Sequence, residues 1–306
     1  MSFPLSDPRI SPATGYASPD YLTALGQGPR AFGATGGWLM SRAIRTSGHT
    51  DLAGPWPIFT CTQWQDLGAA VQGLAAGPIT LTLVSDPFAP LSRADFAAIF
   101  PICRPLHDHW IIDLTGPAQL SAHHRRKLRQ TRAPRIVAGP PTADLAEGWA
   151  RIYAHLVAKK HITDARAFSA ESLAAQLRVP GAQVVTAWDG DTLLGVDLYY
   201  LDRGRAFAHL SAYAPQGYAA SVSYPMLAAA LDHLRPRADA IDLGGAPAGP
   251  AGPGIAQFKA GWTPQMRPSY LCGKVLDPVA YARLAAGADP AGWFPAYRSG
   301  EFTTGP

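Results

Sequence analysis

The segments Asp242-Leu-Gly-Gly245 and Gly254-Ile-Ala-Gln-Phe-Lys-Ala-Gly-Trp262 decide the fold of this chain. The first ends a short apolar run, Ala240–Leu243, which predicts a buried strand, and its two glycines predict a turn. The second places one lysine, Lys259, in a neutral stretch rich in Gly and Pro, and we expect it to be a short helix. Because lysine is mostly exposed in proteins, Lys259 is either a solvated charge or a functional cation.

The composition is that of a globular protein with room for two domains. The 306 residues are 47% hydrophobic and 16% charged. No apolar run approaches the roughly 20 residues that span a bilayer, and the first residues lack the basic and apolar regions of a secretory signal. We therefore expect no membrane insertion and a cytoplasmic protein. The cysteines Cys61, Cys103 and Cys272 are widely spaced, which fits a reducing compartment and neither a disulfide framework nor a zinc site.

The net charge of +4 originates in a single segment. From Leu114 to Ala143 there is no Asp or Glu, and without the basic residues of this window the rest of the chain would be slightly acidic. A patch of this kind indicates a polyanionic partner such as phosphates or RNA, although a solvated helix face is the alternative. The basic residues are Arg125, Arg126, Lys127, Arg129, Arg132 and Arg135.

The hydrophobic pattern predicts an α/β (α+β) chain, with weaker signals in its first third. Helices are expected at Thr62–Ala75, Ser92–Phe100, His123–Arg132, Ala143–Lys160, Ser169–Arg178 and Ser221–Leu234, and from Pro278 on. Strands are expected at Pro78–Val84, Trp110–Leu114, Gln183–Trp188, Thr192–Leu201, Arg205–Ala212, Ala240–Leu243 and Ser269–Leu276.

This order of elements resembles the GNAT acyltransferase fold, and local motifs make the resemblance narrower. The basic stretch RRKLRQTRAPRIV (Arg125–Val137) is similar to the R-x-x-I-R-x-A helix that opens the second half of FemAB-like proteins. The pair DLGG and GIAQFKAGW resembles their D-x-G-G … G-I-x-x-F-K-x-x-F/W-G signature. Asp51–Pro57 and Asp86-Pro87 resemble, more loosely, the degenerate first half of that family.

The resemblance implies tandem GNAT-like units with mixed, mostly antiparallel sheets flanked by helices, the first unit being degenerate. We expect an N-terminal extension (1–20), a degenerate N-terminal unit (21–104), a C-terminal acyltransferase unit (105–290) and a tail (291–306). The implied activity is N-acyl transfer that forms an amide bond. The implied donor is aminoacyl-tRNA, and the acceptor is an amine on a small molecule or peptide.

The resemblance also assigns roles to residues. Lys259 would face the donor, where a phosphate or the oxyanion that develops during acyl transfer needs positive charge. Asp86 would position the amine, its alternative being a turn or cap aspartate. We expect no tightly bound cofactor and no DNA partner. Charged tRNA would be held by residues of the basic segment and of the F-K motif, namely Arg125, Arg126, Lys127, Arg129, Arg132 and Phe258.

Two other donor and function classes stay open. GNAT enzymes that use acyl-CoA carry a Q/R-x-x-G-x-G/A loop, and here Ala214–Pro225 offers Gln216 and Gly217 but no second glycine. An acyl-CoA-dependent N-acyltransferase is therefore the second reading. A catalytically silent RNA- or phosphate-binding module of the same fold is the third, since fold does not determine function.

Further polar residues are candidates for lining an acceptor cleft. Asp242 is expected to fix the glycine turn, and Asp197 to face either the cleft or solvent, while aromatic residues on strands are commonly core. The pair His107 and His109 lacks a third ligand at a convincing spacing, so we expect no metal site. The candidate cleft residues are Asp197, Tyr199, His209, Tyr213, Asp242, Gly244 and Gly245.

Overall fold

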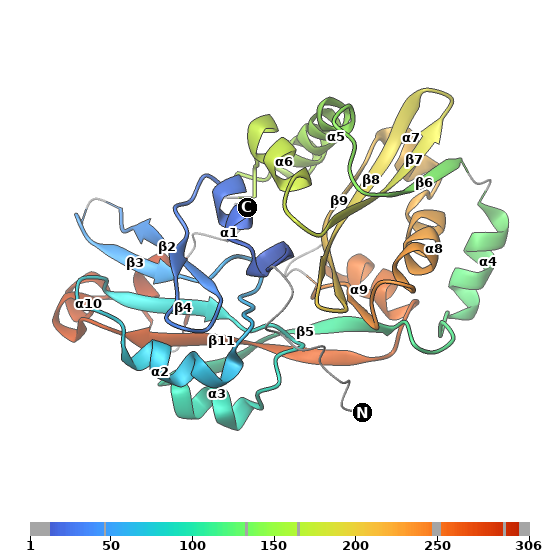
Figure 1. Ribbon diagram of the computed structural model, residues 1–306. Helices are drawn as coiled ribbons and strands as arrows, with labels where there is room; N and C mark the ends of the chain where they lie inside the picture. The colour runs from blue at the N-terminus through green and yellow to red at the C-terminus, as the bar shows by residue number, and fades with distance from the viewer. Residues whose placement is uncertain are drawn as a thin grey trace. The chain divides into compact units, whose positions relative to one another are not determined.

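The computed structural model describes residues 13–45, 47–131, 134–163, 166–246, 252–289 and 292–299. These residues divide into two compact units. One, here the C-terminal unit, comprises the described residues from 108 to 267. The other, the N-terminal unit, comprises those up to 107 together with those from 268 on. Figure 1 shows both.

A mixed, mostly antiparallel sheet forms the C-terminal unit. Its strand order is β5-β10-β9-β8-β7-β6, and all neighbouring pairs are antiparallel except β9 and β10, which run parallel. The turn after β10 contains Gly244, whose φ of 75° is the left-handed conformation that favours glycine. The strands are β5 (Ile102–Asp113), β6 (Arg135–Gly139), β7 (Ala182–Asp189), β8 (Thr192–Asp202), β9 (Arg205–Tyr213) and β10 (Ala240–Asp242).

Helices cover both faces of this sheet (Figure 1). Helix α8 packs one face against the sheet because Met226, Leu227, Ala230, Leu231 and Leu234 recur at helical spacing and are all buried. Helices α5 and α6 lie on the other face. The helices of the unit are α4 (Ala122–Gln130), α5 (Leu145–Lys160), α6 (Ala170–Leu177), α7 (Pro215–Ala219), α8 (Ser223–Leu234) and α9 (Gly252–Ala260).

The N-terminal unit has its own sheet and core. Its strands follow the order β1-β2-β3-β4-β11, with β3 and β4 parallel and the other pairs antiparallel. The strands are β1 (Arg30–Ala31), β2 (Trp38–Ala43), β3 (Thr50–Ala53), β4 (Thr80–Val84) and β11 (Met266–Val275). The helices are η1 (Gly15–Ala17), α1 (Pro19–Ala24), η2 (Trp64–Asp66), α2 (Leu67–Gln72), α3 (Arg93–Ile99), α10 (Pro278–Leu284) and η3 (Ala296–Arg298).

A buried ion pair ties η3 to the sheet of the N-terminal unit. Arg298 Nε donates to Asp51 Oδ2 at 2.7 Å, and Arg298 also donates to the carbonyls of Arg42 and Ala43. The other carboxylate oxygen of Asp51 accepts from Tyr297 at 2.6 Å and from Thr80 at 2.8 Å. The side chains of Arg298 and Asp51 are 4% and 3% exposed. The pair is therefore fully desolvated and satisfied from several elements.

The fold class expected from the sequence is confirmed, and so are the main elements. Ser92 caps α3 through a capping box, and Ser169 caps α6. The elements that differ from the expectation lie where the hydrophobic pattern of the sequence was weak. Strand β5 begins at Ile102, eight residues before the expected start, because Arg104, Pro105 and His107 interrupt the apolar pattern of its first half. Strands β1, β2, β3 and β6 and the five-residue helix α7 were not expected at all.

The domain boundaries also differ in part. The expected boundary between residues 104 and 105 lies close to the division at 107 and 108. Residues from 268 on, however, group with the N-terminal unit rather than with the C-terminal unit, where the sequence analysis placed those up to 290. The reason is that Leu271–Val275 pair with Thr80–Val84 of β4. The expected extension (1–20) is described only from residue 13, and the expected tail (291–306) only over 292–299.

Candidate functional site: a lysine held at a glycine turn

Lys259 does not extend freely into solvent. It lies in the last turn of α9, is half-buried, and its Nζ donates to the carbonyl oxygen of Gly245 at 2.6 Å. That carbonyl belongs to the glycine turn after β10. The Nζ also lies 5.9 Å from the centre of the Trp110 ring, so an aromatic face flanks the ammonium group. The structure thus brings Lys259 and the glycine turn together.

The Asp242 carboxylate fixes the glycine turn. Its Oδ1 accepts the backbone N–H of Gly244 at 2.6 Å, and the side chain is buried. The ring nitrogen Nδ1 of His109, on β5, lies 2.8 Å from Oδ2 and 3.0 Å from Oδ1 of the same carboxylate. Asp242 therefore has the structural role that the sequence predicted. Its partner His109 was weighed only as a metal ligand.

The surroundings of Lys259 lower the pKa of its ammonium group, but the group stays mostly protonated at pH 7. Burial lowers the pKa of Lys259 from its ordinary value to about 8, and the negative charge of Asp242 opposes part of that shift. At pH 7 most molecules thus still carry a protonated lysine. A cation in this environment interacts more strongly with a developing negative charge than one in bulk water, because the local dielectric constant is lower.

The basic helix α4 is anchored by a buried histidine. His124 Nε2 lies 2.9 Å from the carbonyl oxygen of Phe258 on α9, and Nδ1 lies 3.0 Å from the Ser121 hydroxyl. Its ring packs against Phe258, Tyr224 and Trp262. Burial lowers the pKa of His124, which favours the neutral ring. Phe258, expected among the donor-binding residues, thus connects α4 to the helix that carries Lys259.

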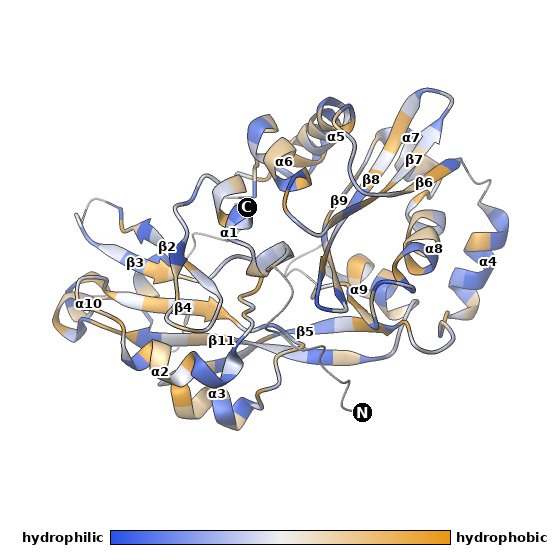
Figure 2. Cartoon of the chain, in the orientation of Figure 1, coloured by the Kyte–Doolittle hydropathy of each residue, from blue (hydrophilic) through white to orange (hydrophobic). Residues whose placement is uncertain are grey.

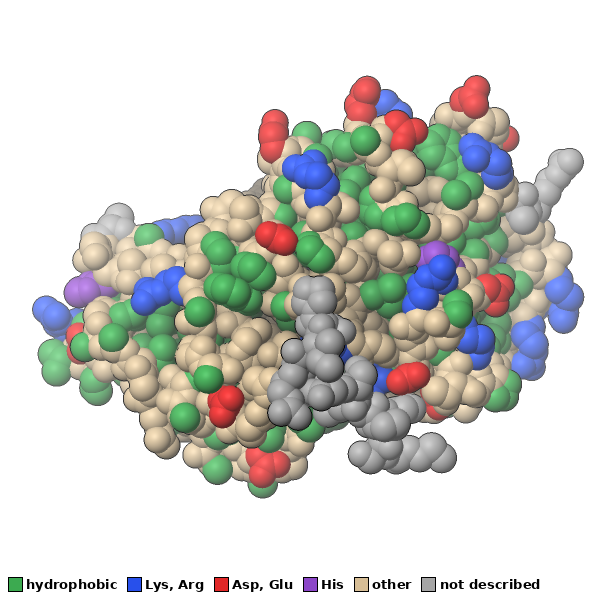
Figure 3. Space-filling model, viewed as in Figure 1, with side chains coloured by type: hydrophobic (Ala, Val, Ile, Leu, Met, Phe, Trp, Pro, Cys, Tyr) green, Lys and Arg blue, Asp and Glu red, His purple; other side chains and the backbone are tan. Residues whose placement is uncertain are grey.

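The arginines of α4 lie at the surface, where the Arg125 guanidinium group donates to the Leu120 carbonyl at 2.7 Å. Arg125, Arg126 and Arg129 are exposed, and Lys127 is half-buried. Figure 2 shows α4 as a mostly hydrophilic helix, and in Figure 3 Lys and Arg side chains gather on the side of the molecule where α4 lies. Arg132, which the sequence analysis grouped with these residues, lies outside the described residues. The basic patch is therefore a surface feature of the C-terminal unit.

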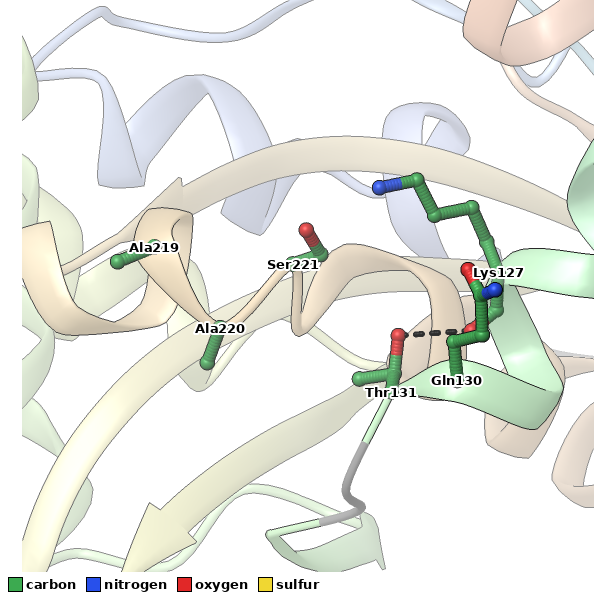
Figure 4. Close-up of a pocket in the computed structure, with 6 residues that line it drawn as sticks. All are labelled: Lys127, Gln130, Thr131, Ala219, Ala220 and Ser221. Carbon is green, nitrogen blue, oxygen red and sulfur yellow. Dashed lines mark hydrogen bonds between the residues drawn. The ribbon is translucent and has the colours of Figure 1, made fainter.

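A pocket of about 310 Å³ lies beside α4. Figure 4 shows the Lys127 side chain reaching from α4 toward the turn between α7 and α8, while the Thr131 hydroxyl donates to the Lys127 carbonyl at 2.9 Å. An ammonium group with hydroxyl and amide groups around it is suited to an anion such as a phosphate. The pocket is lined by Lys127, Gln130, Thr131, Ala219, Ala220 and Ser221.

In the segment expected as a degenerate pyrophosphate loop, the backbone N–H groups at 220–222 already donate within the segment. The backbone N–H groups of Ala220, Ser221 and Val222 donate to carbonyls of Gln216, Tyr218 and Gly217, which closes the end of α7. Gly217 is buried, and a Cβ there would lie 2.2 Å from the Leu194 carbonyl oxygen. Packing against β8 accounts for this glycine, and Gln216 is exposed.

Asp197 lies inside the C-terminal unit. The sequence left two environments open for its side chain, the cleft and solvent, and the structure excludes solvent. Asp197 is 3% exposed, and the Tyr213 hydroxyl donates to its Oδ1 at 2.8 Å. Burial raises the pKa of Asp197 to about 6, against the hydrogen bonds from Ser211 and Tyr213. Burial and the Asp197 charge together raise the pKa of Tyr199 and of Tyr213. Tyr199 belongs to the core beneath α8.

His209 is a packing residue in this structure. Its ring stacks on Tyr200 with centroids 4.7 Å apart, and its Nε2 lies 2.7 Å from Gln176 Oε1. Burial lowers the pKa of His209 to about 3, so its ring is neutral at physiological pH. A neutral histidine held by neutral partners supports the core interpretation that the sequence analysis left open for the strand aromatics.

Asp86 belongs to the N-terminal unit, where it closes the turn after β4. It is 6% exposed, and its Oδ1 accepts the backbone N–H of Phe88 at 2.8 Å. This is the turn role given as the alternative in the sequence analysis. Its assignment to the acceptor amine stays a prediction.

Sequence reasoning missed three residues of the site. His109, Trp110 and His124 contact Asp242, Lys259 and Phe258, each of which was a candidate. His109 and Trp110 lie in a strand, and His124 lies in the first turn of the basic helix, so the sequence offered no spacing that would connect them to α9 or β10. Among the described residues, no cluster of three His, Cys, Asp or Glu side chains is arranged to hold a metal ion.

Comparison with solved structures identifies the fold. FemX matches 90% of this chain and 96% of its own, with a TM-score of 0.63 and 9% identity. The C-terminal DUF2156 domain of a protein assigned as a lysylphosphatidylglycerol synthetase from Agrobacterium fabrum matches 87% of this chain and 89% of its own, with a TM-score of 0.57 and 15% identity. The chain has a FemAB-like GNAT fold.

A conserved protein of unknown function from Bacteroides thetaiotaomicron shares this FemAB-like fold, with a TM-score of 0.56, 11% identity and coverage of 85% of this chain and 90% of its own. No protein-family model and no curated protein matches the sequence. At such identities the likeness concerns the fold, and a function has to be argued from the site. No helix in the described part of the chain has the length and hydrophobicity to cross a membrane.

Proposed function

We propose that this protein is an N-acyltransferase that moves an aminoacyl group from aminoacyl-tRNA to an amine acceptor. The observation that carries the proposal is the half-buried ammonium group of Lys259, held by the Gly245 carbonyl on a turn that Asp242 fixes. A cation held in this way is preorganised, so it needs little rearrangement when negative charge appears nearby.

The chemistry proposed for Lys259 is stabilisation of an oxyanion. The acceptor nitrogen attacks the ester carbonyl carbon, a C–N bond forms, and the carbonyl oxygen becomes negatively charged. When the tetrahedral intermediate collapses, the C–O bond to the ribose breaks and the proton lost by the amine ends on the ribose oxygen. Lys259 binds more tightly to the oxyanion than to the neutral carbonyl, which lowers the barrier.

Donor recognition is assigned to α4 and the pocket beside it. Arg125, Arg126 and Arg129 offer exposed guanidinium groups, and Lys127 contributes an ammonium group to the pocket. Such groups suit the closely spaced phosphates of an RNA stem. The likeness to a lysylphosphatidylglycerol synthetase domain is compatible with an aminoacyl donor. The turn around Gly217 is less suited to the pyrophosphate of acyl-CoA, because its backbone N–H groups at 220–222 already donate to carbonyls of the chain.

A donor competition experiment tests the proposal. Purified protein is incubated with a pool of charged tRNAs and, separately, with acetyl-CoA and longer acyl-CoAs, and both binding and transfer to a panel of primary amines are measured. Saturable, salt-sensitive binding of one charged tRNA with amide formation is expected. Transfer from an acyl-CoA alone would replace the proposal by the CoA-dependent reaction. Binding of tRNA, charged or uncharged, without any transfer would indicate the silent module.

Neutralising the exposed arginines of α4 is expected to weaken tRNA binding and flatten its salt dependence. Each lost phosphate contact lowers the slope of log K against log salt by about 0.7–0.9. The variant is Arg125→Gln with Arg126→Gln and Arg129→Gln, measured by filter binding at several salt concentrations. Three exposed arginines elsewhere in the C-terminal unit, Arg151, Arg178 and Arg237, provide the matched triple control. Equal slopes for the two triple variants would refute the role of α4.

A further inference from the structure

We propose that His109 is a positioning residue for Lys259 and acts through Asp242. The inference rests on the proposed function for the role of Lys259, but its geometry is independent of any substrate. It also gives a role to His109 of the sequence His107-Asp108-His109, whose two histidines were weighed above only as metal ligands.

Four contacts connect the two residues within the C-terminal unit. His109 Nδ1 donates to the Asp242 carboxylate at 2.8 Å, and that carboxylate accepts the Gly244 N–H at 2.6 Å. The next residue, Gly245, accepts the Lys259 ammonium at 2.6 Å. The ring of Trp110, adjacent to His109 in β5, flanks the same ammonium. The position of Lys259 Nζ thus depends on where the Asp242 carboxylate is held.

Burial makes the contribution of His109 important. His109 and Asp242 are 5% and 3% exposed, so water cannot readily replace a lost hydrogen bond. A buried carboxylate that loses a donor turns toward the next positive group. Lys259 is such a group, because the negative charge of Asp242 already acts on its pKa. His109 therefore keeps the carboxylate on the Gly244 N–H and leaves the lysine bound to a neutral carbonyl.

Loss of His109 is expected to raise the pKa of Lys259 by either of two routes. If Asp242 turns to Lys259, the new ion pair favours the charged lysine. If the glycine turn opens instead, solvent reaches the ammonium and again favours the charged form. Both routes raise the pKa of Lys259 above its value of about 8. The free-amine fraction at pH 7 falls tenfold for each unit by which this pKa rises, and labelling of the amine slows accordingly.

The experiment measures Lys259 directly and needs no donor or acceptor. Acetic anhydride labelling of Lys259 is followed by mass spectrometry from pH 6 to pH 11 in wild type and in His109→Leu, His109→Asn and His109→Gln, with thermal melting as a check of folding. Asn places an amide nitrogen near the position of Nδ1, whereas Gln places it near Nε2. His107→Leu, at an exposed position of the same motif, is the control.

We expect labelling of Lys259 at pH 7 to slow by about tenfold or more in His109→Leu and His109→Gln, and to stay near wild type in His109→Asn and His107→Leu. If His109→Leu does not fold, the comparison of Asn with Gln decides. Unchanged labelling in a folded His109→Leu or Gln variant, or slowed labelling in a folded Asn variant, overturns the inference. The transfer assay is a separate readout. Labelling as expected without any transferase activity would support the positioning role and reject the proposed function.

Discussion

Replacing Lys259 by alanine is expected to lower kcat for aminoacyl transfer by about 10²–10³-fold, the usual effect of removing one group that stabilises an oxyanion. KM for the donor should change little, because Lys259 is assigned to the transition state and the phosphates to α4. Salt-dependent binding of tRNA should also persist. The measurement is single-turnover transfer from charged tRNA, combined with filter binding.

Lys274 provides the matched control for this variant. It is also half-buried, and its Nζ donates to a backbone carbonyl, that of Val71, at 3.0 Å. Lys274→Ala therefore removes a similar hydrogen bond at a place that has no proposed part in transfer, and its kcat should stay within about twofold. Equal losses in the two variants would mean that Lys259 acts through stability alone. Loss of tRNA binding in Lys259→Ala would contradict the separation between the cation at the glycine turn and the basic helix.

Replacing Arg298 by methionine is expected to reduce the free energy of unfolding by about 3–5 kcal/mol. The cause is the Asp51 carboxylate, which is buried and would lose its charged partner. The two carbonyls that accept from the guanidinium group, those of Arg42 and Ala43, would lose a donor as well. Urea denaturation followed by circular dichroism measures the change.

Two further variants separate the buried charge from the lost packing. Arg151→Met breaks an exposed pair with Glu147, 3.8 Å apart, and should change the free energy of unfolding by less than about 0.5 kcal/mol. Adding Asp51→Asn to Arg298→Met removes the uncompensated charge, while the amide oxygen can still accept from Tyr297 and Thr80. That double variant should recover a measurable part of the loss. No recovery would show that desolvation of Asp51 is not the cause.

The sequence by itself determined the fold class and most elements of the C-terminal unit. These features depend on local signals. The apolar face of α8 repeats at helical spacing, Ser92 and Ser169 cap their helices, and Asp189-Gly190 joins two strands in a hairpin. Local periodicity, capping and turn chemistry act over a few residues, so they can be recognised without knowing the partners.

Only the tertiary structure decided which side chains meet. His109 lies 133 positions from Asp242, His124 lies 134 positions from Phe258, and Arg298 lies 247 positions from Asp51. The same holds for burial, since Asp197 on β8 alternates like a solvent-facing residue yet packs against Tyr213. Long-range packing sets these contacts, because a buried polar group takes whichever partner the fold brings within hydrogen-bond distance. The contact of His109 with Asp242 could therefore not be predicted from the sequence, because only the fold places β5 beside β10.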